Sequence, residues 1–258
     1  MKFFKWIYKS KQAVTGLVIL IIGGIAIFLG SMFFAGSTGL CANVGYSLLA
    51  SGIVILIQGL ENASDERDRA REWGLDRIYK ARSEKSDDSD PKLGRVRQLD
   101  VVAFGLKSFR STHRKKIEEI LKNGGRIRIL TMDPEGRFVR QREMEEKDSE
   151  GQIKGSISDL VTWANELNDQ GWPGSIEVKG YQCMTLDFYW RADDEIYFGP
   201  YWYHRPSQRT VTYRLKKRSL LPNEGFEIYE DYFEELWNDG EMRELAVPSR
   251  KGGADGRS

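Results

Sequence analysis

The most prominent feature of the hydrophobic pattern is a long apolar stretch near the N-terminus. Residues 12–60 include no Asp, Glu, Lys or Arg. One membrane crossing needs about 20 consecutive apolar residues, so this stretch is long enough for two. A run of small residues at 35–39, Ala-Gly-Ser-Thr-Gly, marks a turn in its middle. The pattern therefore predicts a hairpin of two transmembrane helices, at about 13–34 and 40–60.

The charges around this stretch predict its orientation. Lysines crowd the first eleven residues, and the predicted turn carries no charge. Lys and Arg favour the cytoplasmic side of a membrane, so we expect both termini to be cytoplasmic. A secretory signal peptide is the alternative, but a second apolar segment follows at once and would keep the chain in the membrane.

Glycines recur every seven residues in both apolar segments. A seven-residue period keeps them on one face of a helix, where small residues let two backbones approach closely. These stripes predict a packing surface, either within the hairpin or between copies of the chain. Glycine is also common in membrane helices without such a role. The glycines of the two stripes are Gly16, Gly23, Gly30, Gly45, Gly52 and Gly59.

The pattern changes after residue 60. Residues 61–92 are rich in charge, and the segment 83–91, SEKSDDSDP, has no apolar side chain. We expect a charged stalk and a flexible linker there. Residues 240–258 are mostly polar, with several glycines near the end, and predict a disordered tail.

Between these limits, residues 93–239 alternate between strand and helix patterns. The predicted fold of this domain is α/β, a mixed sheet with helices on its faces. Strands are expected at 99–106, 126–132, 175–181, 184–191, 195–203 and 208–215, and helices at 111–123, 138–147, 156–169 and 225–237.

Composition narrows the possible chemistry. The net charge of +1 argues against a general nucleic-acid binder, so we expect no DNA or RNA partner. The two cysteines, Cys41 and Cys183, and the two histidines, His113 and His204, form no metal-ligating or disulfide pattern. We expect no metal.

Polar and aromatic side chains follow the predicted strands. Ligands of α/β sheets bind at the carboxyl ends of strands, where these residues should gather. Arginines hold phosphates in a bidentate way, and Tyr and Trp faces stack on bases. The set therefore predicts a nucleotide site, although exposed arginines are often merely solvated and Tyr201–Tyr203 could be core or interface. The candidates are Ser108, Arg110, Asp133, Arg137, Arg140, Tyr201, Trp202, His204, Arg205 and Arg209.

Several segments resemble a phospholipase D-like domain: AFGLKSF at 103–109, RIRILTMDPEGRFVR at 126–140, and LDFYWRADDEIYFGPYW at 186–202. Active members carry His-x-Lys-x4-Asp before the hairpin turn. When Asp193 is aligned with the motif's Asp, Leu186 replaces the His and Phe188 replaces the Lys. The resemblance therefore implies that this domain has lost the catalytic residues of the family and that the protein is not an enzyme.

The whole layout resembles the two-helix membrane effectors of bacterial antiphage nucleotide-signalling systems. That resemblance implies a homo-oligomer in the bacterial inner membrane. A cyclic nucleotide from a cognate cyclase would bind the cytoplasmic domain, control assembly of the hairpin and so disrupt the lipid bilayer. Two alternatives remain: a membrane-anchored phosphodiesterase or nuclease that relies on His204, and a membrane scaffold that recruits a partner.

Overall fold

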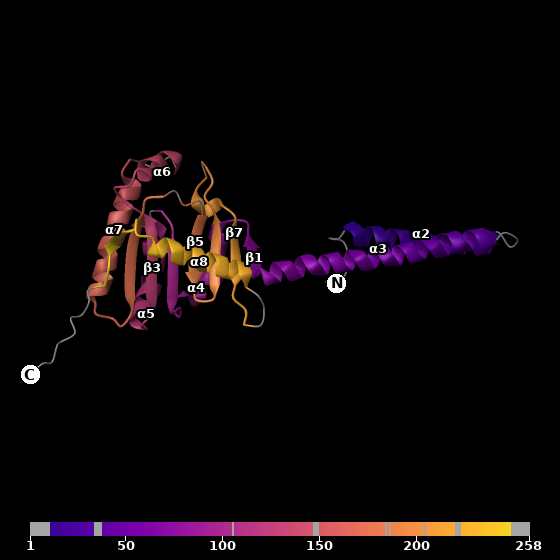
Figure 1. Cartoon of the computed structure of the whole chain (residues 1–258), viewed down its shortest axis with the longest axis horizontal. Coiled ribbons are helices and arrows are strands. Elements are labelled where there is room, and N and C mark those ends of the chain that lie inside the picture. The colour runs from indigo at the N-terminus through magenta and orange to yellow at the C-terminus, as the bar shows by residue number, and fades with distance from the viewer. Residues whose placement is uncertain are drawn as a thin grey trace, which may run out of the picture. The chain divides into compact units, whose positions relative to one another are not determined.

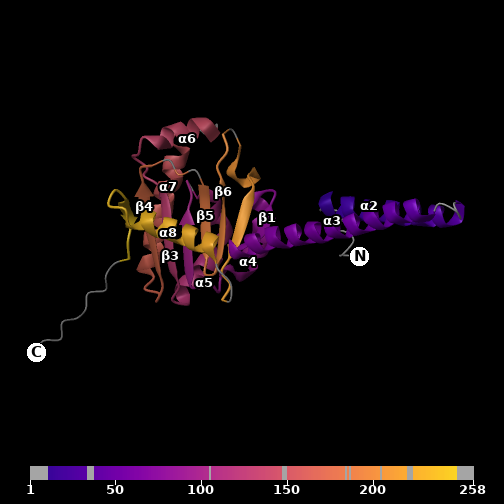
Figure 2. The same ribbon diagram turned by 45° about the vertical axis from the view of Figure 1, so that its right-hand side comes forward.

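The computed structural model describes residues 11–33, 38–104, 106–146, 150–183, 185, 187–203, 205–219 and 223–248 (Figures 1 and 2). The chain divides into two compact units, Met1–Arg71 and Glu72–Ser258. We call them the N-terminal unit and the α/β unit.

The N-terminal unit is a pair of antiparallel helices held together by glycines. Helix α2 spans Lys11–Phe33, and α3 spans Thr38–Glu72. A Cβ atom at Gly16 would lie 2.7 Å from the backbone nitrogen of Leu56, and one at Gly23 would lie 3.1 Å from the carbonyl oxygen of Gly45. The glycine stripes therefore form the contact within the hairpin, where a larger side chain would push the helices apart.

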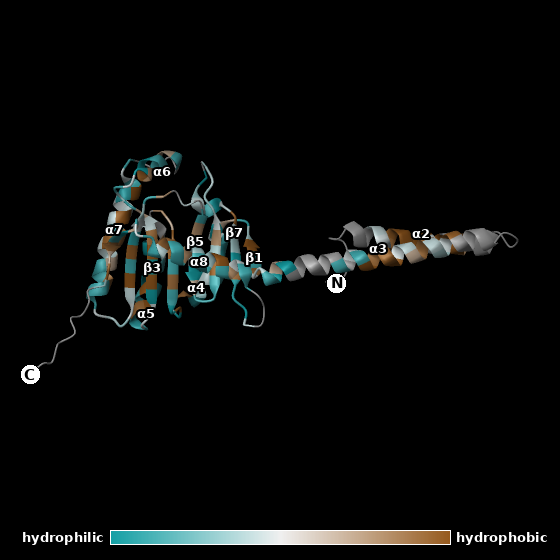
Figure 3. Ribbon diagram, viewed as in Figure 1, coloured by the Kyte–Doolittle hydropathy of each residue, from teal (hydrophilic) through white to brown (hydrophobic). Residues whose placement is uncertain are grey.

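The glycines lie where the two helices touch each other. Many of the large apolar side chains of α2 and α3 are therefore on the other sides of the helices and are exposed. Figure 3 shows hydrophobic positions along both helices. Gly59 is buried like the other described stripe glycines, and the surroundings of Gly30 lie outside the described residues. The exposed apolar residues are Leu17, Val18, Ile21, Ile22, Ile25, Phe28, Leu29, Val44, Tyr46, Ile53, Val54 and Ile57.

The described parts of the helices do not meet the requirements of a membrane crossing. Nowhere in them is a helix both long enough and apolar enough to span a bilayer. The predicted transmembrane helices at about 13–34 and 40–60 are therefore wrong, and so is the inner-membrane location with cytoplasmic termini.

The predicted fold class, a membrane hairpin followed by a phospholipase D-like domain, is wrong for the same reason. The predicted α/β fold with a mixed sheet is present, and its sheet has eight strands in the order β1-β7-β6-β5-β2-β3-β4-β8. The strands are β1 Leu75–Tyr79, β2 Gln98–Val102, β3 Arg126–Met132, β4 Ser175–Tyr181, β5 Asp187–Ala192, β6 Glu195–Pro200, β7 Thr212–Lys216 and β8 Arg243–Ala246.

Strand β2 lies at the seam of this sheet. It pairs in parallel with β3, which pairs in parallel with β4. On its other side β2 pairs antiparallel with β5, and β6, β7 and β1 continue that antiparallel half. A parallel half and an antiparallel half of the sheet therefore meet between β2 and β5.

Helices cover both faces of the sheet. Helices α4, α5 and α7 contribute to the apolar core on one face of the sheet. Helix α8 packs on the other face, and α6 and the first turns of α7 contribute to the core on that second face (Figures 1 and 2). We call the first the α5 face and the second the α8 face. The helices are η1 Arg82–Lys85, α4 Ser86–Leu93, α5 Lys107–Lys122, α6 Phe138–Glu146, α7 Gln152–Asp169, η2 Ser207–Arg209 and α8 Glu224–Asn238.

Two segments differ from the sequence prediction. Residues 83–91, expected to be a flexible linker, form most of η1 and α4, and Leu93 at the end of α4 is fully buried. In the expected disordered tail, 240–258, strand β8 pairs with the edge of β4. Both segments are held by features that hydropathy does not register. These are buried polar and charged side chains in η1 and α4, and backbone hydrogen bonds in β8.

A buried charge cluster joins β2, β3 and β5 to α8. Arg128 on β3 donates to both carboxylate oxygens of Asp100 on β2, at 2.7 and 2.9 Å, and pairs with Glu234 of α8 at 2.6 Å. Arg191 on β5 pairs with Glu230 of α8 at 2.7 Å and lies 3.7 Å from Asp100. Asp100 is fully buried, so these arginines provide the compensating charge that its burial requires.

We expect Arg128→Met to lower the free energy of unfolding by about 3–5 kcal/mol, because Asp100 would lose its bidentate partner in the interior. Arg126→Met is the matched control on the same strand. Arg126 is half exposed and pairs with Glu177 at the surface, so its loss should cost at most about 1 kcal/mol. Urea unfolding of the full chain, followed by circular dichroism, measures both. If both variants lost the same free energy of unfolding, the buried charge cluster would not be what stabilises the packing of α8 on the sheet.

Candidate functional site

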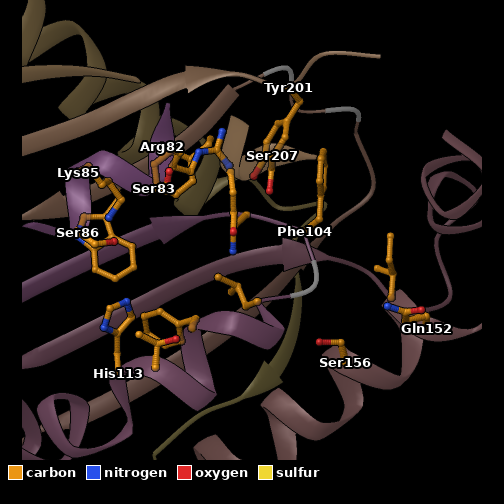
Figure 4. A pocket seen from close by; sticks show the side chains of 18 residues that line it. Arg82, Ser83, Lys85, Ser86, Phe104, His113, Gln152, Ser156, Tyr201 and Ser207 are labelled. Carbon is orange, nitrogen blue, oxygen red and sulfur yellow. The ribbon is translucent and has the colours of Figure 1, made fainter. Parts of the chain in front are cut away.

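A cavity of about 370 Å³ lies where the carboxyl end of β2 meets β5 (Figure 4). Its walls come from η1, the start of α4, the residues after β2, the first turns of α5 and α7, and η2. Ligands of α/β sheets bind at this kind of place, beyond strand ends where the topology changes. The fold therefore puts a cavity at its most favourable position for binding.

Strand β5 supplies the aromatic floor of the cavity. Side chains alternate along a strand, so Phe188 and Trp190 share the α5 face while Tyr189 belongs to the core on the α8 face. Phe104 and Tyr201 close one side, with their ring centroids 4.1 Å apart. These rings give the cavity a largely apolar, aromatic wall.

Two buried cations line the same cavity, Arg82 and Lys85 (Figure 4). They are 8% and 5% exposed. The spacing of three residues puts both on one side of η1, because side chains at i and i+3 of a 3-10 helix eclipse. None of the 18 lining residues is an Asp or a Glu. The lining thus carries positive charge and no negative charge.

Arg82 is held between an aromatic wall and a hydroxyl. Its guanidinium carbon lies 4.0 Å from the ring centroid of Phe188 and 5.0 Å from that of Tyr201. Its Nη2 donates to Thr210 Oγ1 at 3.2 Å. The carboxyl of Asp187, at the start of β5, interacts electrostatically with the Arg82 guanidinium. Burial raises the pKa of this carboxyl, and the positive charge of Arg82 opposes that shift. Arg82 is therefore positioned by stacking.

Lys85 is surrounded by rings. Its Nζ lies 3.9 Å from the ring centroid of Trp190, 5.3 Å from that of Tyr197 and 5.6 Å from that of Phe188. Burial lowers the pKa of Lys85 to about 7; Asp90 opposes this shift and Arg82 adds to it. With this pKa, the protonated and the neutral form of the Lys85 amine are both populated near neutral pH, whereas an ordinary lysine is almost fully protonated there.

His113, on α5, lies beside this amine in the lining of the cavity. Its ring stands edge-on to Trp190 at 5.6 Å, and its Nδ1 is 3.9 Å from Asp90 Oδ2. Burial is the largest influence on the pKa of His113 and lowers it, which favours the neutral imidazole. Within the described residues, Nδ1 has no hydrogen-bond partner.

Of the ten predicted ligand-binding residues, Tyr201 lines this cavity. Arg110 instead pairs with Asp159 of α7 at 2.8 Å. Asp133 is buried and accepts hydrogen bonds from Gln182 and Arg243 at 3.1 and 3.2 Å. The structure therefore does not bring these residues together around one ligand.

The remaining predicted residues lie at the surface or outside the description. Arg137 lies over the ring of Phe138, and Arg140 is exposed and 3.7 Å from Glu150. Trp202 and Arg205 are exposed and stack on each other at 4.9 Å. Arg209 is exposed in η2; His204 and the side chain of Ser108 lie outside the described residues. Whether any of these residues binds a ligand stays a prediction.

Sequence reasoning missed the two cations because they lie in residues 61–92, which were interpreted as a charged stalk and a flexible linker. Arg82 and Lys85 belong to the polar stretch before α4, which has no apolar period to indicate burial. Phe188 was noticed as the replacement of a catalytic lysine, but its place in a cavity was not. The signal in the sequence that could have found them is the three-residue spacing of Arg82 and Lys85, which puts both side chains on one side of a 3-10 helix.

Comparison with known proteins gives little further information. No family model matches the chain, and no curated protein matches it. Among solved structures, the archaeal chromatin protein TrmBL2, described as having a novel mode of DNA binding, is 12% identical with a TM-score of 0.39. The match covers 76% of this chain and 68% of that chain. A likeness at this level indicates no shared function.

These findings correct the sequence-based identification. No matching family model and no matching curated protein supports antiphage defence or phospholipase D-like function. The predicted effector and both alternatives require membrane helices that the described chain does not show, so they are wrong. The predicted lipid-bilayer partner is wrong, because the described residues contain no helix that could cross it. Whether a cyclic nucleotide binds the chain stays a prediction.

We expect Lys85→Met to stabilise the chain at pH 6. Lysine has a pKa of about 10.4 in an unfolded chain and about 7 in this fold. The unfolded chain therefore binds more protons between these values, and wild-type stability rises with pH across that window. Below pH 7 the penalty for the buried ammonium is complete, of order 3–5 kcal/mol. Removing the charge abolishes this penalty.

Urea unfolding of wild type and Lys85→Met from pH 6 to pH 10 measures the effect. The gain of the variant should shrink towards pH 10. Lys92→Met is the control, because Lys92 is exposed and pairs with Glu195 at the surface. A variant that is less stable than wild type at pH 6 would contradict the assignment of Lys85 as a strained buried cation.

Proposed function

We propose that the α/β unit is a non-enzymatic binding module for a small anionic ligand with an aromatic body, such as a nucleotide, cyclic or linear. The observation that carries this proposal is the lining of the cavity at the β2–β5 seam. Arg82 and Lys85 face it, and no lining residue is acidic.

The electrostatic support comes from the cost of burying charge. A cation removed from water is unfavourable unless another group replaces its hydration. The rings around Arg82 and Lys85 offset part of that cost through cation–π attraction, which is worth about 2 kcal/mol or more at desolvated sites. A bound phosphate or carboxylate would supply full opposite charge and accept hydrogen bonds from both side chains.

The shape of the cavity supports the aromatic part of the ligand. Small-molecule sites occupy about 300–1,000 Å³ and combine apolar walls with a few polar groups. This cavity has about 370 Å³, with Phe104, Phe188, Trp190 and Tyr201 in its walls and several hydroxyl and amide side chains around them. The positive ends of α5 and α7 also lie at its rim and favour negative charge.

The non-enzymatic character rests on what β5 contributes. Phe188 and Trp190 bring rings to the floor of the cavity, and neither can attack phosphorus or transfer a proton. The lining contains no carboxylate that could act as a general base or hold a metal ion. The groups present suit recognition of a ligand better than its hydrolysis.

The test is thermal unfolding of the full chain with matched pairs of ligands. The panel pairs adenosine with AMP and cyclic AMP, and adds sugar phosphates and dicarboxylates. A ligand at 100 times its dissociation constant should add about 2.7 kcal/mol of stability. We expect phosphate-bearing members to stabilise the chain while adenosine does not. Failure of every anion in the panel to stabilise it would refute the proposal.

Substitution then locates the site. Arg82→Gln should remove the stabilisation by the anion. Arg140→Gln is the matched control, because Arg140 is an exposed arginine outside the cavity. Equal effects of the two substitutions would place binding on the surface and contradict the assignment of the cavity.

A further inference from the structure

We propose that Lys85 is a nucleophilic amine that captures a carbonyl group of the ligand as an imine. The cavity would then take aldehyde-bearing anions covalently and reversibly. This inference rests on the proposed function, since Arg82 would hold the anionic group while Lys85 reacts.

The geometry around Lys85 favours a free amine over an ion pair. Its Nζ lies over Trp190 and near Tyr197 and Phe188. Lysines desolvated in an apolar pocket beside another cation are the type that act as nucleophiles in proteins. Lys85 has both features, because its neighbour Arg82 lines the same cavity.

The charged and titratable groups around Lys85 come from several elements. Arg82 on η1 disfavours the ammonium form, and Asp90 on α4 favours it. His113 on α5 and Tyr197 on β6 also lie beside Lys85. Burial lowers the pKa of His113 and raises the pKa of Tyr197, and both shifts favour the neutral side chain at pH 7. Burial is the largest influence and brings the pKa of Lys85 to about 7. At pH 7 the free-amine fraction is about a thousandfold that of an ordinary lysine.

The chemistry balances without an oxidant or reductant. The lone pair of Nζ attacks the carbonyl carbon, the C=O π pair moves to oxygen, and a proton moves from nitrogen to that oxygen. Loss of the hydroxyl with a second proton releases one water and leaves a C=N bond. His113 is the imidazole in the cavity lining, and its ring, kept neutral by burial, can accept and return a proton during these steps. Hydrolysis reverses the capture.

The experiment uses pyridoxal 5′-phosphate, an aromatic aldehyde that carries a phosphate, on the full chain. Borohydride traps the imine, and peptide mass spectrometry reports which lysines are modified. At pH 7 we expect Lys85 to be modified at least ~10-fold faster than Lys115, an exposed lysine of α5 outside the cavity. The rate at Lys85 should rise through about pH 7 and then level off, whereas an ordinary lysine becomes more reactive up to about pH 10.

Two controls separate this inference from the proposed function. Lys85→Arg should abolish trapping at this position, whereas Lys115→Arg, which lies outside the cavity, should leave trapping at Lys85 unchanged. Pyridoxal, which has no phosphate, should react more slowly with Lys85 but equally with Lys115, and inorganic phosphate should slow trapping at Lys85 in the wild type. Labelling of Lys85 no faster than of Lys115 would overturn the imine. Anion binding is then judged by the thermal measurements alone.

Discussion

The buried pair between Asp100 and Arg128 is the constraint on which the α/β unit depends. Asp100 lies on β2, where the parallel and antiparallel halves of the sheet meet. A fully buried carboxylate requires compensating charge, which Arg128 supplies from β3, with Arg191 nearby on β5. The same arginines pair with Glu234 and Glu230 and so fix α8 on the sheet. One charge cluster therefore fixes the register of the seam.

The cavity uses the opposite side of that seam. Because side chains alternate, the strands that turn Asp100 and Arg191 towards α8 turn Phe188 and Trp190 towards α5. The charges on the α8 face are balanced by carboxylates, whereas Arg82 and Lys85 line their cavity without an acidic neighbour in the lining. The first arrangement stabilises the fold. The second keeps Lys85 buried at an energetic cost, which a bound anion would reduce.

Sequence reasoning recovered the regular elements of the α/β unit better than its site. Apolar periods indicated the strands and helices between residues 99 and 237, because burial of one face imposes a period on each element. The cations of η1 could not be found this way, since a four-residue helix has no such period and its burial depends on rings from β5 and β6. Residues 12–60 illustrate the opposite error. A charge-free stretch suggested a membrane hairpin, whereas the structure places Gly16, Gly23, Gly45 and Gly52 at the contact between the two helices.

The central claim is that the cavity at the seam binds anions through Arg82 and Lys85. The most direct measurement is a crystal structure of the full chain grown with tungstate, a heavy analogue of phosphate, in which anomalous scattering locates the ion. The account predicts a peak inside the cavity, within hydrogen-bond distance of the Arg82 guanidinium and Lys85 Nζ. Peaks confined to exposed arginines such as Arg140 and Arg205, with the cavity empty, would contradict it.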